Sequence, residues 1–307
     1  MPPSSMVSSI SRRSCRTTSP STATVSSPCS GRPSRRATEA QPTGCTVGAV
    51  ATHVSGTRTI GYDTHGEGAP ILVIHGTTQS RTGWDQVRAA CSAPLQWVTV
   101  EMPGSGESSM PEGPIDLDQV CDDFADLMKV RGHERYHVAG YSLGAVMALH
   151  LAARHPGAVE SVTSVCGWAR TDARMRLTFD LWRRLLSIGT DLFMRYALVD
   201  GYTAETLEVL EPMADAAVQL AATMIQPGSD AQLELDARID IVESLAKVVA
   251  PCLVIGGLQD RWVDVSKSRD IVSRVAGSRL VEIDAGHLLI GERADAVAAL
   301  ISEHARV

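Results

Sequence analysis

The sequence lacks the features of a membrane-embedded, zinc-binding or disulfide-stabilised protein. No apolar run approaches the roughly 20 residues that a membrane-spanning helix needs. The seven cysteines are odd in number, widely scattered, and form no C-x-x-C pair; they stand at positions 15, 29, 45, 91, 121, 166 and 252. This spacing argues against a disulfide framework or a zinc site. It suits a reducing compartment, so we expect a cytoplasmic protein. From the lack of long apolar runs we expect no membrane partner.

Basic residues are scarce in the part of the chain that follows residue 45, which also contains most of the apolar residues. The whole chain has 28 basic and 35 acidic residues, and residues 1–45 contain six arginines and one glutamate. The rest of the chain therefore has 22 basic against 34 acidic residues, a net charge of −12. A surface with this charge repels nucleic acid, so we expect no nucleic-acid partner.

Residues 1–45 have almost no periodic apolar positions and consist mainly of Ser, Thr, Pro and Arg. This composition predicts a disordered tail. The tail lacks the continuous apolar stretch of a secretory signal, although its Arg-rich, Ser-rich and acid-poor composition superficially matches an organelle transit peptide. We favour the interpretation that the translation start is set upstream of the true domain.

Beyond the tail, the chain alternates between strand and helix patterns. Two alternating segments from Val47 and Thr57 predict an N-terminal hairpin. The continuous apolar runs "APILVIHG", "LQWVTVEMPGSGES", "YHVAGYS" and "VESVTSVCGW" are typical of strands buried on both faces. Helical patterns beginning at Asp116 and Leu143 separate them. Strand and helix in alternation predict an α/β fold with a mostly parallel sheet.

The alternation stops after Trp168, and residues up to about 245 have helical patterns only. The sheet then resumes with "PCLVIGGLQD", a helix near 265–276, the strand "SRLVEIDAGH" and a closing helix from Leu288 to His304. We therefore expect a tail at 1–45, a core at 46–168 and 246–307, and a helical cap at 169–245. At 44% hydrophobic residues, the chain can bury such a core.

The stretch "GYSLG" at 140–144 matches the G-x-S-x-G pattern between a strand and a helix. The pattern places Ser142 in a strained turn, and glycines on either side avoid collisions there. Such a serine either caps the helix or acts as a nucleophile. A serine nucleophile needs a histidine as base and an acid that orients the histidine.

The base and the acid are expected at the same edge of the sheet as Ser142. His287 follows the last predicted strand, and Asp260 follows the strand before it. The chain order Ser, Asp, His is that of one known triad arrangement. Asp264 could substitute for Asp260, and Asp284 is expected at the end of the last strand.

The donors for an oxyanion are expected on two loops. The backbone N–H of Thr77, in "HGTTQS", is one candidate, and that of Leu143, which follows the nucleophile, is the other. The stretch "MPGSGES" at 102–108 has neither Walker nor G-x-G-x-x-G spacing, so we interpret it as a structural turn.

Together these motifs resemble the α/β-hydrolase superfamily from about Val47 to the closing helix. The series "HG", "MPGSGES", "GYSLG", "GGLQD" and "DAGH" is similar to the esterase, enol-lactonase and cofactor-free haloperoxidase-like group. The sequence departs from that pattern at Glu101, where relatives usually have Asp, and at Asp264, where Pro is common. The resemblance implies a hydrolase without a cofactor or metal that cleaves an ester or lactone of a small molecule.

We expect the cap to set specificity through apolar side chains, although the same residues could simply pack the cap on the core. The candidates in the cap are Leu177, Trp182, Leu186 and Phe193. Trp84 and Trp168 follow strand ends and are further candidates, and Trp262, beside Asp260, either lines the pocket or packs under it. The cap also contains arginines at 170, 174, 176, 183, 184 and 195, one of which could bind a carboxylate on the substrate.

The sequence leaves two other kinds of function open. The same fold could catalyse C–C bond hydrolysis, perhydrolysis or a lyase step, or it could serve as a small-molecule receptor with little turnover. The sequence does not define the oligomeric state or the natural substrate.

Overall fold

The computed structural model describes residues 50–306. The chain divides into two units, Met1–Cys45 and Thr46–Val307, and the described residues belong to the second. The tail predicted to be disordered lies outside the described residues. Within them, no helix is both long and apolar enough to cross a bilayer.

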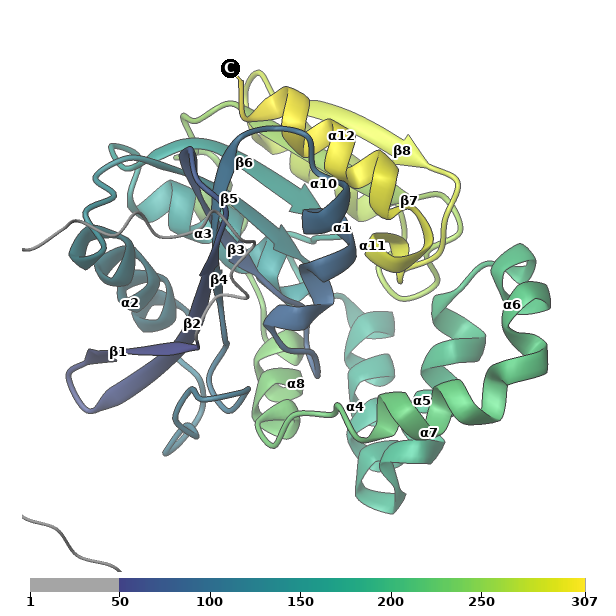
Figure 1. Ribbon diagram of the computed structural model, residues 1–307. Coiled ribbons are helices and arrows are strands. Elements are labelled where there is room, and N and C mark those ends of the chain that lie inside the picture. The colour runs from purple at the N-terminus through teal and green to yellow at the C-terminus, as the bar shows by residue number, and fades with distance from the viewer. Residues whose placement is uncertain (1–49, 307) are drawn as a thin grey trace, which may run out of the picture. The chain divides into compact units, whose positions relative to one another are not determined.

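An eight-stranded sheet with the order β1-β2-β4-β3-β5-β6-β7-β8 organises the core (Figure 1). β1 and β2 form the predicted hairpin, β2 also pairs antiparallel with β4, and all other neighbours are parallel. The predicted α/β class with a mostly parallel sheet is confirmed. The strands are β1 (Ala51–Ser55), β2 (Arg58–His65), β3 (Ala69–Ile74), β4 (Leu95–Val100), β5 (Tyr136–Tyr141), β6 (Val159–Val165), β7 (Cys252–Gly257) and β8 (Arg279–Ile283).

Helices cover both faces of this sheet, so the central strands are mostly buried on both sides. On β3, Leu72 and Ile74 join one apolar cluster, while Ile71 and Val73 join the other. The first cluster includes residues of α2 and α3, and the second includes residues of α1, α11 and α12. The core helices are η1 (Arg81–Trp84), α1 (Asp85–Ala90), α2 (Leu117–Val130), α3 (Leu143–Arg154), α10 (Ser266–Arg274), α11 (Leu289–Glu292) and α12 (Ala294–His304).

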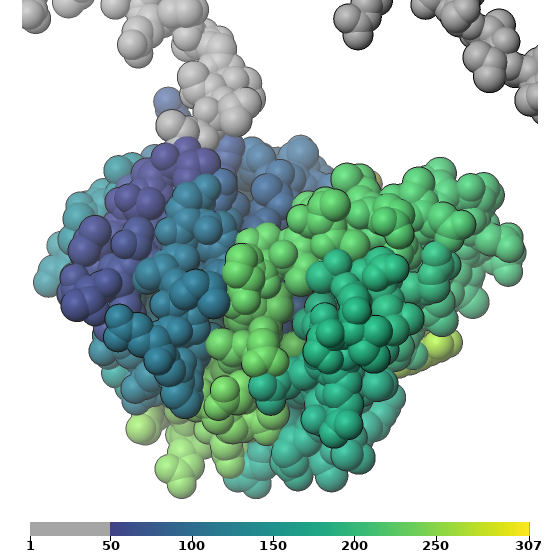
Figure 2. All heavy atoms as spheres, turned by 90° about the horizontal axis from the view of Figure 1, so that it is seen from below, coloured from purple at the N-terminus to yellow at the C-terminus, as the bar shows by residue number. Residues whose placement is uncertain are grey.

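Between β6 and β7 the chain is helical, in the interval where the sequence predicted an inserted layer. Seen from below, this segment lies beside the loop after β4 (Figure 2), and Gly228 N donates to Gly104 O across that boundary. Its elements are α4 (Ala173–Ile188), α5 (Thr190–Gly201), α6 (Ala204–Leu210), η2 (Glu211–Met213), α7 (Ala214–Ala222), α8 (Ser229–Ala237) and α9 (Val242–Leu245).

Two helices are shorter than the sequence pattern indicated. The long amphipathic stretch in the insertion is divided at Gly189 into α4 and α5. The closing helix is divided at Arg293 into α11 and α12. Apolar periodicity continues across both breaks, so periodicity alone did not reveal them.

Candidate active site

The turn between β5 and α3 holds Ser142 in a strained conformation, with φ 55° and ψ −119°. Such a backbone costs roughly 1–3 kcal/mol in a non-glycine residue. The turn is tight because a Cβ on Gly140 would lie 1.9 Å from the carbonyl oxygen of Gly144, and one on Gly144 would lie 2.3 Å from that of Ile74. Both positions therefore require glycine, and Ser142 remains partly accessible at the start of α3.

His287 and Asp260 meet Ser142 at the carboxyl edge of the sheet. His287 Nε2 lies 3.0 Å from Ser142 Oγ, and His287 Nδ1 lies 2.6 Å from Asp260 Oδ2. The other carboxylate oxygen of Asp260 accepts the amides of Trp262 and Val263 at 2.9 and 2.8 Å. A carboxylate can only accept, so Nδ1 carries the hydrogen and Nε2 is free to accept the Ser142 hydroxyl proton.

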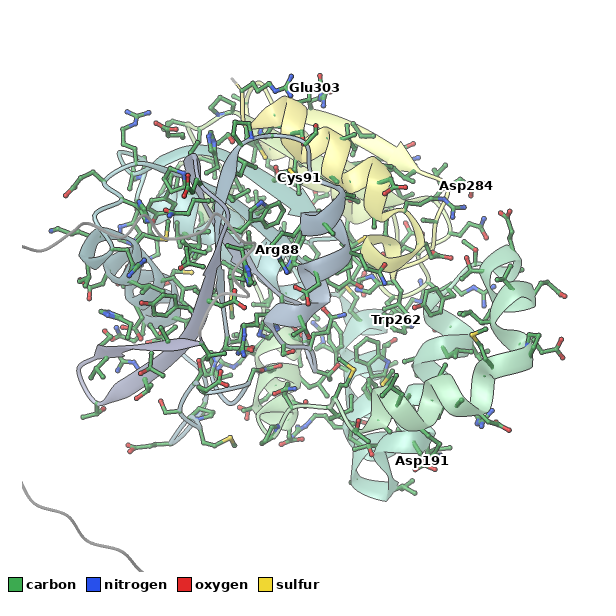
Figure 3. The ribbon with its side chains drawn as sticks, viewed as in Figure 1. Arg88, Cys91, Asp191, Trp262, Asp284 and Glu303 are labelled. Carbon is green, nitrogen blue, oxygen red and sulfur yellow. The ribbon has the colours of Figure 1, made fainter. Side chains whose placement is uncertain are left out.

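The alternative acids lie away from the imidazole. Asp264 is exposed and accepts the Ser266 amide at 2.9 Å, at the start of α10. Asp284 is exposed at the end of β8, where it accepts from the side chain of Gln259 (Figure 3). The structure therefore places Asp260, and neither alternative, beside His287.

Two backbone amides next to Ser142 have no hydrogen-bond acceptor within residues 50–306. They belong to Thr77 and Leu143, the two residues that the sequence suggested as oxyanion donors. A Cβ on Gly76 would lie 3.3 Å from Ser142 Cβ, so the Thr77 loop passes directly beside the serine. Free amides at this place can stabilise negative charge on a substrate carbonyl oxygen.

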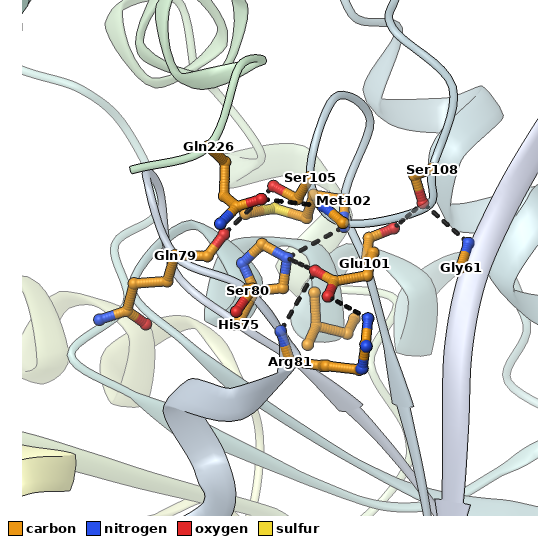
Figure 4. A network of polar contacts seen from close by, with 12 residues as sticks. Gly61, His75, Gln79, Ser80, Arg81, Glu101, Met102, Ser105, Ser108 and Gln226 are labelled. Carbon is orange, nitrogen blue, oxygen red and sulfur yellow. Dashed lines mark hydrogen bonds and ion pairs between the residues drawn. The ribbon is translucent and has the colours of Figure 1, made fainter. Parts of the chain in front are cut away.

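A buried polar network holds the base of that loop (Figure 4). His75 is fully buried, and its Nδ1 lies 2.8 Å from Gly76 O while its Nε2 lies 3.1 Å from both the Met102 amide and Glu101 Oε2. Arg81 donates to Glu101 from its backbone at 3.1 Å and its guanidinium at 2.7 Å. Burial raises the pKa of Glu101, but these partners outweigh burial and hold the pKa below its ordinary value. We therefore interpret His75 as a residue that supports the loop structurally.

An aromatic cluster connects the helical segment to the histidine. The Trp262 ring lies 4.9 Å from the His287 ring and 4.5 Å from the Trp182 ring, at the border between core and insertion (Figure 3). Trp182 also contacts Phe193 at 5.4 Å, and Trp168 contacts Phe179 at 6.0 Å. Apolar surface thus continues from the insertion to the imidazole.

Two of the suggested specificity residues do not face this region. Leu177 is 73% exposed, because α4 turns that position towards solvent. Trp84 is buried in the apolar cluster that contains α1 and donates from its indole to Ile74 O at 3.1 Å, so its contacts are those of a core residue. Leu186 is half-buried and packs against the main core cluster.

Each of the six arginines of the insertion has a partner within the protein, which argues against the suggestion that one binds a substrate carboxylate. Four form ion pairs with aspartates, at Arg170–Asp240, Arg183–Asp230, Arg184–Asp180 and Arg195–Asp215. Arg174 and Arg176 are exposed and donate to backbone carbonyls. Ion pairs at the surface therefore account for four of the six charges, and backbone carbonyls are the partners of the other two.

Glu292 links the insertion to the histidine loop, which sequence reasoning missed. Its Oε1 accepts the Thr203 amide at 2.9 Å and the Thr206 hydroxyl at 2.6 Å, and its Oε2 accepts the Gly286 amide at 2.6 Å. Burial raises the pKa of Glu292, but the hydrogen bonds from these donors outweigh burial, and the net result is a pKa below the ordinary value. The position of Glu292, five residues after His287, was the available signal.

One group of potential metal ligands within residues 50–306 coincides with the triad. Donor atoms of Cys166, Asp260 and His287 lie within 4.8 Å of one another, and all three residues are buried. Burial and the neighbouring Asp260 raise the pKa of the Cys166 thiol well above its ordinary value, which disfavours the thiolate that binds metals. Asp260 and His287 already use the facing atoms in their mutual hydrogen bond.

Sequence reasoning also missed Asp236 on α8. Its Oδ2 accepts the Thr77 hydroxyl at 2.7 Å, and the residue is 1% exposed. Burial raises its pKa to about 8 although the Thr77 hydroxyl lowers it. Gln232, four residues earlier on the same helix, accepts the Thr78 amide at 3.0 Å. Gln232 and Asp236 are four residues apart, so helical spacing could have predicted that both lie on the same face of α8. It could not have predicted the contact of Asp236 with Thr77.

Comparison with known proteins gives matches over most of the folded part. A family model described as "Alpha/beta hydrolase family" matches residues 71–300. A protein of Azorhizobium caulinodans named "Putative carbamate hydrolase RutD" is 30% identical over 233 residues, which cover 73% of this chain and 86% of the relative. Pyrrolizixenacetamide deacetylase of Xenorhabdus hominickii is 24% identical and covers 75% and 88%.

Solved structures share the fold. The enol-lactonase from Burkholderia xenovorans LB400 superposes with a TM-score of 0.73 at 24% identity, covering 84% of this chain and all of that one. The bromoperoxidase from Bacillus anthracis has a TM-score of 0.72 at 19% identity and covers 83% and 98%. With the match over residues 71–300 and the relative at 30% identity, these findings show that the chain is an enzyme of the alpha/beta hydrolase family.

Proposed function

We propose that the protein is a serine hydrolase that cleaves a carboxylic ester or lactone of a small, largely apolar molecule through an acyl-enzyme intermediate. The observation that carries the proposal is the hydrogen-bonded series Ser142 Oγ, His287 and Asp260, at 3.0 and 2.6 Å. A serine hydroxyl becomes an effective nucleophile only when such a base takes its proton.

In the proposed reaction, Ser142 Oγ attacks the carbonyl carbon while His287 Nε2 takes the hydroxyl proton. The carbonyl oxygen becomes negative, and the amides of Thr77 and Leu143 donate to it. His287 then gives the proton to the leaving oxygen, and the acyl group stays on Ser142. Water, deprotonated by the same imidazole, attacks the acyl carbon and releases the acid.

We assign the segment α4–α9 the role of a cap over Ser142. The aromatic contacts from Trp182 through Trp262 to His287 support this assignment and favour an apolar substrate. The names of two relatives refer to a carbamate and an acetamide, so compounds with a nitrogen on the scissile carbonyl belong among the substrates to be tested.

A panel of p-nitrophenyl esters, simple lactones and aryl carbamates tests the proposal, with Ser142→Ala as the matched variant. We expect turnover of several esters or lactones by the wild type and a loss of about 10³-fold or more in the variant. Binding of these compounds with equally low turnover in both proteins would instead indicate a receptor.

A further inference from the structure

Asp236 is a buried carboxyl that the proposed reaction does not use. Its Oδ2 accepts the Thr77 hydroxyl at 2.7 Å, and its Oδ1 is buried without a hydrogen-bond partner among residues 50–306. A buried polar atom left unpaired costs about 1–3 kcal/mol. Folded proteins usually avoid this cost by pairing their buried polar atoms, so the unpaired Oδ1 of Asp236 requires an explanation.

No cation among residues 50–306 compensates the Asp236 carboxyl. Asp63, another aspartate with an unpaired buried oxygen, pairs through Oδ2 with Arg81 Nε at 3.2 Å. Asp236 forms no ion pair within the described part of the chain, and only burial and the Thr77 hydroxyl affect its pKa, which lies near 8. The side chain is therefore mostly protonated at pH 7. Because Oδ2 and the Thr77 hydroxyl oxygen can share that proton, Oδ1 is a carbonyl oxygen that can accept a hydrogen bond.

The position of Asp236 relative to the reacting atoms follows from the loop between β3 and η1. Gly76 packs against Ser142, since a Cβ on it would lie 3.3 Å from Ser142 Cβ. Thr77 is the next residue, and its own amide is a proposed oxyanion donor. The Asp236 carboxyl contacts the side-chain hydroxyl of this same residue, so a single residue, Thr77, connects it to the proposed oxyanion site.

The backbone around Asp236 is held on both sides, so the carboxyl is fixed in place. The Asp236 carbonyl accepts the Thr171 hydroxyl at 2.5 Å, and that hydroxyl oxygen accepts the Trp168 indole N–H at 2.8 Å. One turn earlier, the Gln232 side chain accepts the Thr78 amide at 3.0 Å. A polar group held rigidly next to an oxyanion-donor residue is suited to recognition.

We propose that Asp236 is a specificity-determining residue whose Oδ1 accepts a hydrogen bond from an N–H or O–H group within two bonds of the scissile carbonyl carbon. The inference rests on the proposed hydrolase function and narrows its substrate class. It favours 2-hydroxyacyl esters and N–H carbamates over plain alkyl esters. A site with a buried polar group rejects an analogue that lacks the matching group, because its own atom then stays unpaired.

Two esters of nearly equal size test this: p-nitrophenyl glycolate, which carries CH₂OH, and p-nitrophenyl propionate, which carries CH₂CH₃. Each kcat/KM is divided by the spontaneous hydrolysis rate of the same ester, which removes their intrinsic reactivity difference. We expect the wild type to prefer glycolate by about tenfold, the value of one buried hydrogen bond. In Asp236→Leu and Asp236→Ala the ratio of the normalised glycolate rate to the normalised propionate rate should fall to about one, whatever the change in the absolute rates.

Asp240→Asn is the matched control, because Asp240 lies close in sequence but pairs with Arg170 on the surface. It should keep the tenfold preference. An unchanged ratio in folded Asp236→Leu or Asp236→Ala, at whatever absolute rate, would show that Asp236 only supports the loop. A wild-type ratio near one overturns the proposal without any variant, so the test does not depend on the variants folding.

The two proposals fail differently in this experiment. Equal normalised rates on both esters, lost in Ser142→Ala, overturn the role of Asp236 and leave the hydrolase proposal standing. If the wild type releases p-nitrophenol from both esters no faster than Ser142→Ala does, the hydrolysis of such esters is refuted. The proposed role of Asp236 is then refuted as well.

Discussion

Replacing Asp236 by Asn should change how stability depends on pH. Burial raises the pKa of Asp236 from 3.8 to about 8. Above about pH 4 the unfolded chain therefore loses this proton while the folded protein keeps it. The unfolded state binds fewer protons, so stability falls as pH rises, until the folded carboxyl also ionises near pH 8.

The size of this effect follows from the two pKa values. Each pKa unit corresponds to about 1.4 kcal/mol, so the carboxyl costs about 4 kcal/mol of stability at pH 7 relative to pH 4. Whole domains are stable by only about 5–15 kcal/mol. Asn has a similar shape and no ionisable proton, so Asp236→Asn removes the pH-dependent part of the cost.

Urea unfolding of the wild type and of Asp236→Asn at several values between pH 5 and 7.5 measures the effect. The difference in unfolding free energy should grow by about 3 kcal/mol in favour of the variant over this range. Asp240→Asn, at an exposed ion pair, should show no such trend. A difference that stays constant with pH would refute the claim that the buried carboxyl is neutral.

Three other changes have defined outcomes. Asp260→Asn should lower kcat by about 10⁴-fold because the imidazole loses its orienting carboxylate, whereas Asp264→Asn should stay within about twofold; comparable losses would assign the acid wrongly. Glu292→Gln should lower the free energy of unfolding in urea by about 1–3 kcal/mol, since its charged oxygens accept from the Thr203 and Gly286 amides, and no change would show these contacts to be dispensable. Deleting residues 1–45 should leave the melting temperature and activity nearly unchanged; a large drop would mean that the tail contributes to the fold.

The sequence was informative where function depends on local geometry. Gly140 and Gly144 predicted the tight turn at Ser142, because a Cβ at either position would collide with backbone. The places of Asp260 and His287 followed from topology, since parallel strands bring their carboxyl ends to one edge of the sheet. Neither inference needed a long-range contact to be known.

The sequence failed where the outcome depends on how the insertion packs on the core. Asp236 and Thr77 are 159 residues apart, and no local pattern relates them. Leu177 fits the apolar periodicity of its segment but is 73% exposed, because packing chooses which face of α4 is covered. Gly189 breaks the segment in a way that periodicity did not reveal. The arginines of the insertion could not be assigned until their aspartate partners were known.

The central claim is that His287 makes the hydroxyl of Ser142 reactive, and labelling with a fluorophosphonate tests it most directly. Peptide mass spectrometry should find one phosphonyl group, on Ser142 of the wild type, and the labelling rate should fall by about 10³-fold or more in His287→Ala. Absence of label on Ser142, or equal labelling rates in the two proteins, would contradict the account.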